Sequence, residues 1–253
     1  MLHRATAEKL YKACGFQAKP GVVHRMLGLP SRDLLEFVAI PGSVPQSLLV
    51  HDDIAFERKM FRARRAVQLI SFLPFVRAVA VCNSLGFQMV HEESDVDLFI
   101  VTARGRVWSA RWWVTGVLAL LRMRPGESMR DPICVSFFVD ESIAHLSGVR
   151  IENDIYFEFW LRSLMPMLGD HPLFNLGAKT APEFRVKTRI SRIREILAGL
   201  ISENFVRRQQ MNILPDEVRD RALHNDTTVV LSDTIIKLHQ NDRRVELRDA
   251  VYN

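Results

Sequence analysis

The chain has few of the patterns that mark disulfide-linked or zinc-binding proteins. Its 253 residues include only three cysteines, Cys14, Cys82 and Cys134, and no CxxC pair. An odd number without paired Cys or His spacing argues against both a disulfide framework and a zinc site. The eight histidines show neither HxxxH nor HExxH spacing. We therefore expect the cysteines to be reduced thiols of the core.

Long apolar segments are lacking too. The longest, Trp112 to Leu121, contains Gly116 and is flanked by Arg111 and Arg122. It reaches about half of the ~20 residues that a membrane span needs, so we expect a buried helix and no membrane span, with a helix lying on a membrane surface as the alternative. The N-terminal stretch MLHRATAEKLYKACGF has no apolar signal core, which predicts a cytoplasmic protein.

Positive charge is in excess, with a formal net charge of +5. Basic side chains gather in two runs, which can hold phosphates or can form the solvated face of amphipathic helices. Apolar residues recur at three- and four-residue spacing through both runs, which favours the second interpretation. The runs comprise Arg58, Lys59, Arg62, Arg64 and Arg65, and then Lys187, Arg189, Arg192 and Arg194.

Hydrophobic periodicity predicts an α/β (α+β) fold with a small mixed sheet flanked by helices. Residues 1–50 read as a short helical or irregular region, residues 51–145 as the core, and residues 146–253 as mainly helical. In the last region we expect a final pair of helices around SDTIIKLHQNDRR. In the core we expect helices at about 54–72 and 107–121 and strands at 76–81, 96–102 and 133–139.

The segment NSLGFQMVHEESDVDLFIVT carries two aspartates, Asp95 and Asp97, one residue apart and followed by an apolar run. Alternate residues of a strand share a face, so these carboxylates should lie side by side. Two such carboxylates repel unless a cation lies between them, and hard oxygen donors suit Mg²⁺. The ordinary alternative is that Ser94 and Asp95 turn the chain into the strand while Asp97 lies on a solvated sheet face.

The arrangement of a strand, Asn83-Ser84, a short spacer and Asp95-Val96-Asp97-Leu98 resembles the nucleotidyltransferase superfamily of DNA polymerase beta. From about residue 56 onward, three-quarters of the chain is similar to a bacterial nucleotidyltransferase-like group of poorly defined function. The resemblance implies that Asn83 and Ser84 contact nucleotide phosphates and that Asp95 and Asp97 are the catalytic, Mg²⁺-ligating carboxylates. It also implies a nucleoside triphosphate substrate and a nucleic-acid or protein acceptor. Residues 1–50 would then be a remnant of the winged-helix module that precedes this core in longer relatives.

Two features depart from the family pattern. The glycine of the phosphate turn is Asn83, which tolerates positive φ but adds a side chain. A third carboxylate is expected on the strand near residue 136, where alternation places Ser136 on one face with Cys134, Phe138 and Asp140. Asp140 is the other candidate for this position; it lies on the correct face, but we expect it one strand repeat too far along, near the edge of the sheet. The sequence therefore leaves open an active transferase, a catalytically silent nucleotide- or RNA-binding protein, and a regulator whose C-terminal helices bind a partner.

Basic residues near the acidic strand complete the set of candidates. Arg104 and Arg106 follow that strand directly, and we expect them to contact phosphate. Arg243 and Arg244 are weaker candidates, with a solvated or ion-paired helix end as the alternative.

Overall fold

The structure, a computed structural model, describes residues 46–86, 90, 92–127, 130–175, 184–186, 192–224, 227–239 and 244–252. The N-terminal region expected over residues 1–50 lies outside these ranges except for its last five residues, which begin a helix.

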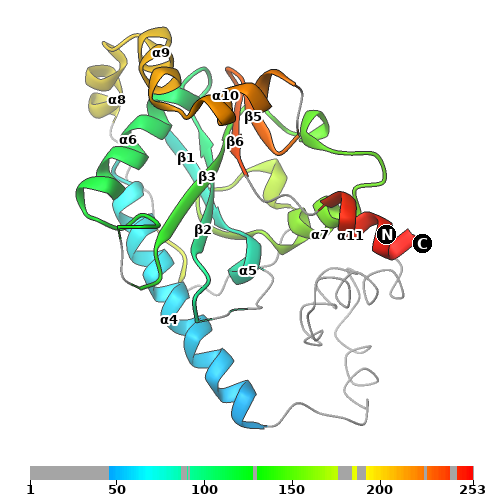
Figure 1. Cartoon of the computed structure of the whole chain (residues 1–253). Helices are drawn as coiled ribbons and strands as arrows, with labels where there is room; N and C mark the ends of the chain where they lie inside the picture. The colour runs from blue at the N-terminus through cyan, green and yellow to red at the C-terminus, as the bar shows by residue number, and fades with distance from the viewer. Residues whose placement is uncertain are drawn as a thin grey trace.

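A six-stranded mixed sheet forms the centre of the molecule, with strand order β4-β1-β2-β3-β6-β5 (Figure 1). The α+β class predicted from the sequence is confirmed. The strands are β1 (Val76–Val81), β2 (Val96–Thr102), β3 (Ile133–Asp140), β4 (Met165–Leu168), β5 (Val229–Leu231) and β6 (Ile235–Leu238).

Helices cover both faces of this sheet (Figure 1). In chain order they are α4 (Gln46–Ile70), α5 (Asn83–Gly86), α6 (Val107–Leu120), α7 (Ile155–Ser163), α8 (Arg192–Gly199), α9 (Glu203–Ile213), α10 (Asp216–Leu223) and α11 (Arg244–Tyr252). Short 3-10 turns at Ser147–Val149 and Pro172–Phe174 lie among them. None of the helices in the described ranges is both long and apolar enough to cross a bilayer.

Only the central strand pair β2 and β3 runs parallel, whereas the other neighbouring strands are antiparallel. A parallel pair needs a crossover, and α6 provides it. Consequently the starts of β2 and β3 and the end of β1 meet at the same edge of the sheet. This edge carries the acidic segment.

Each face of the sheet has its own apolar core. On one face, α4 and α6 bury Met60, Val67 and Trp108 against residues such as Ile100. The periodicity of the first basic run therefore does reflect an amphipathic helix. On the other face, Trp160 of α7 packs against the side chains of the central strands, with Phe99 and Phe137 as its ring partners.

The region after residue 146 differs from the prediction in one respect. It is mainly helical, but it also contributes β4, β5 and β6 to the central sheet. The expected pair of helices around SDTIIKLHQNDRR is wrong, because Ile235–Leu238 forms β6 and pairs with β3 and β5. Helix α11 begins at the last residue of this stretch, Arg244, and residues 240–243 lie outside the described ranges.

Candidate metal and nucleotide site

The two aspartates lie at the edge where β2 and β3 begin. Asp95 immediately precedes β2 and Asp97 is its second residue, and both are half-buried. Backbone bonds tie the edge together: the Cys82 amide donates to the Asp97 carbonyl over 3.1 Å, and the Val96 amide to the Pro132 carbonyl over 2.8 Å. The end of β1 and the start of β3 therefore flank the acidic pair on either side.

The turn after β1 brings Asn83 and Ser84 to the same edge. Asn83 has φ 52°, in the left-handed region that the sequence led us to consider for this residue. The Trp160 Nε1–H donates to Asn83 Oδ1 over 2.9 Å, and the Asn83 side chain is also hydrogen-bonded to Asp97. Because Oδ1 accepts from Trp160, the amide nitrogen is the group that donates to Asp97. The Asn83 side chain is thus a fixed donor to one of the carboxylates.

The electrostatic environment of the two carboxylates disfavours charging both. Burial raises the pKa of Asp97 to about 6, assisted by the charge of Asp95 and opposed by hydrogen bonds from Asn83 and Cys134. Burial also raises the pKa of Asp95, while the positive charge of Lys59 lowers it. Within the described ranges neither carboxylate forms an ion pair. A bound cation would relieve this repulsion.

Cys134, and not Ser136, lies across from Asp97. The register pairs Asp97 with Cys134 and Phe99 with Phe137, so two residues of β3 bulge opposite one residue of β2. The bulge breaks the alternation on which the sequence prediction depended. Phe137 packs on the face of Phe99, whereas Phe138 packs on the opposite face. Cys134 and Ser136 remain neighbours, with their side chains hydrogen-bonded, but the expected extension of their face to Phe138 is wrong.

The Cys134 side chain is a neutral hydrogen-bond donor to Asp97. Burial, followed by the charge of Asp97, raises the pKa of the Cys134 thiol to about 12. Ser136 remains near the site because its hydroxyl is hydrogen-bonded to the Cys134 sulfur. At neutral pH this position therefore offers a thiol in place of a third carboxylate.

Asp140 lies at the opposite end of β3 and does not join the acidic pair. It pairs with Thr102, five residues beyond Asp97, which corresponds to about 16 Å along the strand. Its carboxylate is buried and accepts from the amides of Gly105 and Ser142. Asp140 stabilises the loop after β2 and is not placed to act as the missing ligand.

Arg104 and Arg106 also lie at the far end of the sheet. Both follow the C-terminal end of β2, whereas Asp95 and Asp97 mark its N-terminal end. The Arg106 guanidinium stacks over the Phe75 ring with its Cζ 5.0 Å from the ring centroid. The prediction that these arginines lie near the acidic pair is wrong, because a whole strand separates them from it.

Arg244 is likewise not placed to bind phosphate. It is buried and donates to Asp154 over 2.8 Å and to the Val149 carbonyl over 2.7 Å. Arg243 lies outside the described residues.

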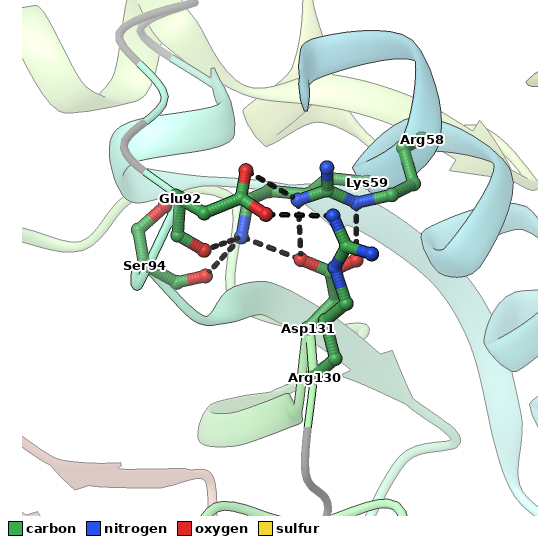
Figure 2. Close-up of polar contacts among 6 residues, drawn as sticks. All are labelled: Arg58, Lys59, Glu92, Ser94, Arg130 and Asp131. Atoms are coloured by element: carbon green, nitrogen blue, oxygen red, sulfur yellow. Dashed lines mark hydrogen bonds and ion pairs between the residues drawn. The ribbon is translucent and has the colours of Figure 1, made fainter. Parts of the chain in front are cut away.

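The sequence analysis missed an ionic network on the segment that leads into Asp95, and the Lys59–Asp131 pair at its centre is buried (Figure 2). Lys59 of α4 is fully buried, and its ammonium donates to the carbonyls of Glu92 and Ser94 over 3.0 and 2.6 Å and to Asp131 Oδ1 over 2.7 Å. Arg58 donates to both oxygens of Asp131 and to Glu92. Arg130 donates to Glu92 as well. The high density of basic residues in α4 was the only signal for this network in the sequence.

Asp131 is the carboxylate nearest in the chain to the start of β3, but its charge is already satisfied. Burial raises its pKa, yet hydrogen bonds from Arg58 and Lys59 outweigh burial and leave the pKa lowered. In the part of the chain that the structure describes, no group of three or more metal-ligating side chains is present. Among the described residues, Asp95 and Asp97 are therefore the two carboxylates of this edge that no ion pair engages.

Comparisons of the chain with protein-family models, with curated proteins and with solved structures gave no match.

Proposed function

We propose that this protein binds a Mg²⁺–nucleoside triphosphate complex at Asp95 and Asp97 and transfers the nucleotidyl group to an acceptor hydroxyl. The hydroxyl oxygen bonds to the α-phosphorus, the bond from the α-phosphorus to the bridging oxygen breaks, and pyrophosphate and the hydroxyl proton leave. The observation that carries the proposal is the pair of carboxylates at one sheet edge. Within the described ranges neither carboxylate is ion-paired, and the charge of Asp95 contributes to the raised pKa of Asp97. The resemblance to nucleotidyltransferases supports the same assignment. A nucleic acid or a protein is the proposed acceptor class.

The donor set fits a Mg²⁺ ion that is shared with a substrate. Mg²⁺ prefers oxygen ligands and is held in many nucleotide sites by one or two carboxylates together with substrate phosphates. Asp95 and Asp97 supply two such carboxylates, and the protonated thiol of Cys134 is a poor ligand for a hard cation. With two protein ligands we expect weak binding of Mg²⁺ alone and stronger binding in the presence of the triphosphate.

Bound Mg²⁺ would neutralise charge on the triphosphate as the α-phosphorus is attacked. The residues of the chain orient the carboxylates and contact the phosphates. Asn83, held by Trp160, donates to Asp97 and keeps that carboxylate oriented. Ser84 lies in the same turn and is the proposed phosphate contact.

A second candidate function is a nucleotide- or RNA-binding protein that does not catalyse transfer. Cys134 favours it, because this residue occupies the register position opposite Asp97 and brings a neutral thiol to the site. Two-metal transfer needs ligands for a second ion about 3.5–4 Å from the first. Asp131 does not supply them while Arg58 and Lys59 hold its oxygens.

Thermal unfolding with and without Mg²⁺ and each nucleoside triphosphate tests the binding. A ligand selective for the folded state raises the melting temperature, so the wild type should show a shift that requires both Mg²⁺ and nucleotide. Asp95→Asn combined with Asp97→Asn should abolish the shift and keep the fold. Arg104→Gln with Arg106→Gln is the matched control, because these residues lie at the far end of β2, and it should keep the shift. An equal shift in the aspartate variant would place the nucleotide elsewhere.

Incubation with α-labelled triphosphates separates the two candidate functions. Transfer of label to pooled RNA or protein that depends on Asp97 supports the transferase. Binding without transfer supports the silent protein.

A further inference from the structure

The buried ammonium of Lys59 lies beside the acidic edge and contacts the segment that leads into it (Figure 2). We propose that Lys59 is a positioning residue that fixes the segment Glu92–Ser94 and through it Asp95. The part of this inference that concerns binding of a metal–nucleotide by Asp95 rests on the proposed function. The part that concerns the position of the segment Glu92–Ser94 is independent of that function.

All three donors of the ammonium are engaged, and they join three separate elements. Lys59 belongs to α4, its two carbonyl partners belong to the segment before β2, and Asp131 precedes β3. Because an ammonium group has three N–H donors and no acceptor, this set of bonds satisfies it completely. Lys59 therefore connects the helix with the starts of both parallel strands.

The bond to the Ser94 carbonyl acts directly on Asp95. That carbonyl belongs to the planar peptide unit that ends at the Cα atom of Asp95. The bond is 2.6 Å long, and it is made by a fully buried donor. Holding the oxygen of this unit restricts the rotation that would move the Asp95 side chain away from the edge. The position of Asp95 thus depends on a side chain from a helix 36 residues earlier in the chain.

Stability alone gives little reason for a lysine here. A buried ion pair contributes little relative to apolar residues of the same volume, because desolvation of both charges offsets their attraction. A positioning role accounts for the charge, since a cation can bind two carbonyl oxygens and a carboxylate at once. A methionine would fill the same space without binding any of them.

Arg58 provides the matched control within the same helix. It shares Asp131 and Glu92 with Lys59, but it contacts the Glu92 side chain and no backbone carbonyl of the segment. Its side chain is 26% exposed, whereas that of Lys59 is fully buried. Arg58→Met therefore weakens the ion pair and leaves the carbonyl bonds in place. Lys59→Met removes both.

Amide hydrogen exchange tests the fixing of the segment without any ligand. In Lys59→Met, exchange at the Val96 amide, which donates to the Pro132 carbonyl, should accelerate relative to exchange at Ile100 in the middle of β2. In Arg58→Met the ratio of the two rates should stay as in the wild type. An unchanged ratio in Lys59→Met would overturn the proposal even if the protein bound nucleotide.

Titration of the folded proteins with Mn²⁺ and ATP, CTP, GTP or UTP tests the effect on Asp95. We expect Lys59→Met to weaken binding by about tenfold or more, as loss of a residue that orients a metal ligand does, and Arg58→Met to bind as the wild type. In the Asp95→Asn background, Lys59→Met should have no further effect, because its action passes through Asp95. Equal losses in Lys59→Met and Arg58→Met, or additive losses with Asp95→Asn, would overturn the proposal.

A wild type that binds none of these complexes would refute the proposed function and leave the exchange result to decide the role of Lys59.

Discussion

Asp97 and Cys134 face each other across the parallel strands β2 and β3, and their side chains are hydrogen-bonded. The thiol is neutral at physiological pH, because burial and the neighbouring carboxylate raise the pKa of Cys134 to about 12. The strand position opposite Asp97 thus carries a proton donor and not a carboxylate. We expect this pair to determine whether the protein catalyses transfer, which the following substitutions test.

Cys134→Asp is expected to convert the site into a three-carboxylate site. Nucleotidyl transfer should rise by about tenfold or more, which corresponds to ~1.4 kcal/mol of transition-state free energy. Without metal, the third carboxylate adds repulsion and should lower the melting temperature. Mg²⁺ should restore the lost stability. Initial rates with α-labelled triphosphates, and melting with EDTA or Mg²⁺, measure the two effects.

Cys134→Ser is the control for this experiment, since it removes the thiol without adding a charge. Its transfer rate and its response to Mg²⁺ should match those of the wild type. Ser136→Asp offers a second comparison, because Ser136 lies in the bulge and not opposite Asp97. A larger gain from Ser136→Asp than from Cys134→Asp would contradict the register argument.

The left-handed backbone at Asn83 leads to a prediction about stability. Both Asn83→Gly and Asn83→Ala lose the hydrogen bonds to Trp160 and Asp97. Alanine must also adopt φ 52°, which costs an L-residue about 1 kcal/mol or more, whereas glycine adopts it freely. Urea unfolding should therefore find the glycine variant more stable than the alanine variant by about 1 kcal/mol, the reverse of their usual order in helices. Equal stabilities would mean that the turn relaxes when the side chain is lost.

The central strands could be predicted because their signals are local. Val76–Val81 and Val96–Thr102 are apolar runs bounded by turn residues, and the structure begins and ends both where the sequence predicted. Helix α6 follows from its apolar length and also lies within one residue of its predicted end. The placement of Asp95 and Asp97 at the start of β2 needed no further information.

The rest of the site depends on contacts between distant residues. A bulge in β3 changes which side chain faces Asp97, and the alternation pattern of a single strand does not reveal it. Ile235–Leu238 is a short apolar run that suits a helix or a strand, and pairing with β3 decides between them. The partners of Lys59 lie 33 to 72 residues away in the chain, so its role emerges only in the folded protein.

Removing one partner of the buried pair Arg244 and Asp154 should strongly destabilise the helical layer formed by α7 and α11. Asp154 caps α7 by accepting from the Phe157 amide over 3.0 Å, and Arg244 donates to the same carboxylate from α11. Arg244→Met leaves a buried carboxylate without its cation, which costs about 3–5 kcal/mol. Urea unfolding should show this loss. Arg248→Met, in the same helix, should leave the midpoint unchanged because Arg248 pairs with its exposed neighbour Asp249. A small effect of Arg244→Met would mean that water reaches Asp154.

The raised pKa of Asp97 predicts how stability depends on pH when no metal is bound. Burial is the main cause of the shift to about 6 from the ordinary value of 3.8. Between these values the folded protein holds a proton that the unfolded chain has released. Stability from this group is therefore fully present below about pH 4, falls as the pH rises, and is lost above about pH 6. A shift of about two units corresponds to a loss on the order of 3 kcal/mol.

Asp97→Asn isolates this contribution, because asparagine stays neutral at every pH. Carboxylates with lowered pKa values, such as Asp131 and Glu195, change stability in the opposite direction and are present in both proteins. The free energy of unfolding, measured by urea titration in EDTA from pH 4 to pH 8, should therefore be compared as the difference between variant and wild type. We expect the free energy of unfolding of Asp97→Asn, relative to that of the wild type, to rise steadily between pH 4 and pH 6. Above pH 6 the difference should stay constant. A difference that does not change with pH would show that Asp97 ionises as an ordinary exposed carboxylate, and it would remove the electrostatic argument for a cation at this edge.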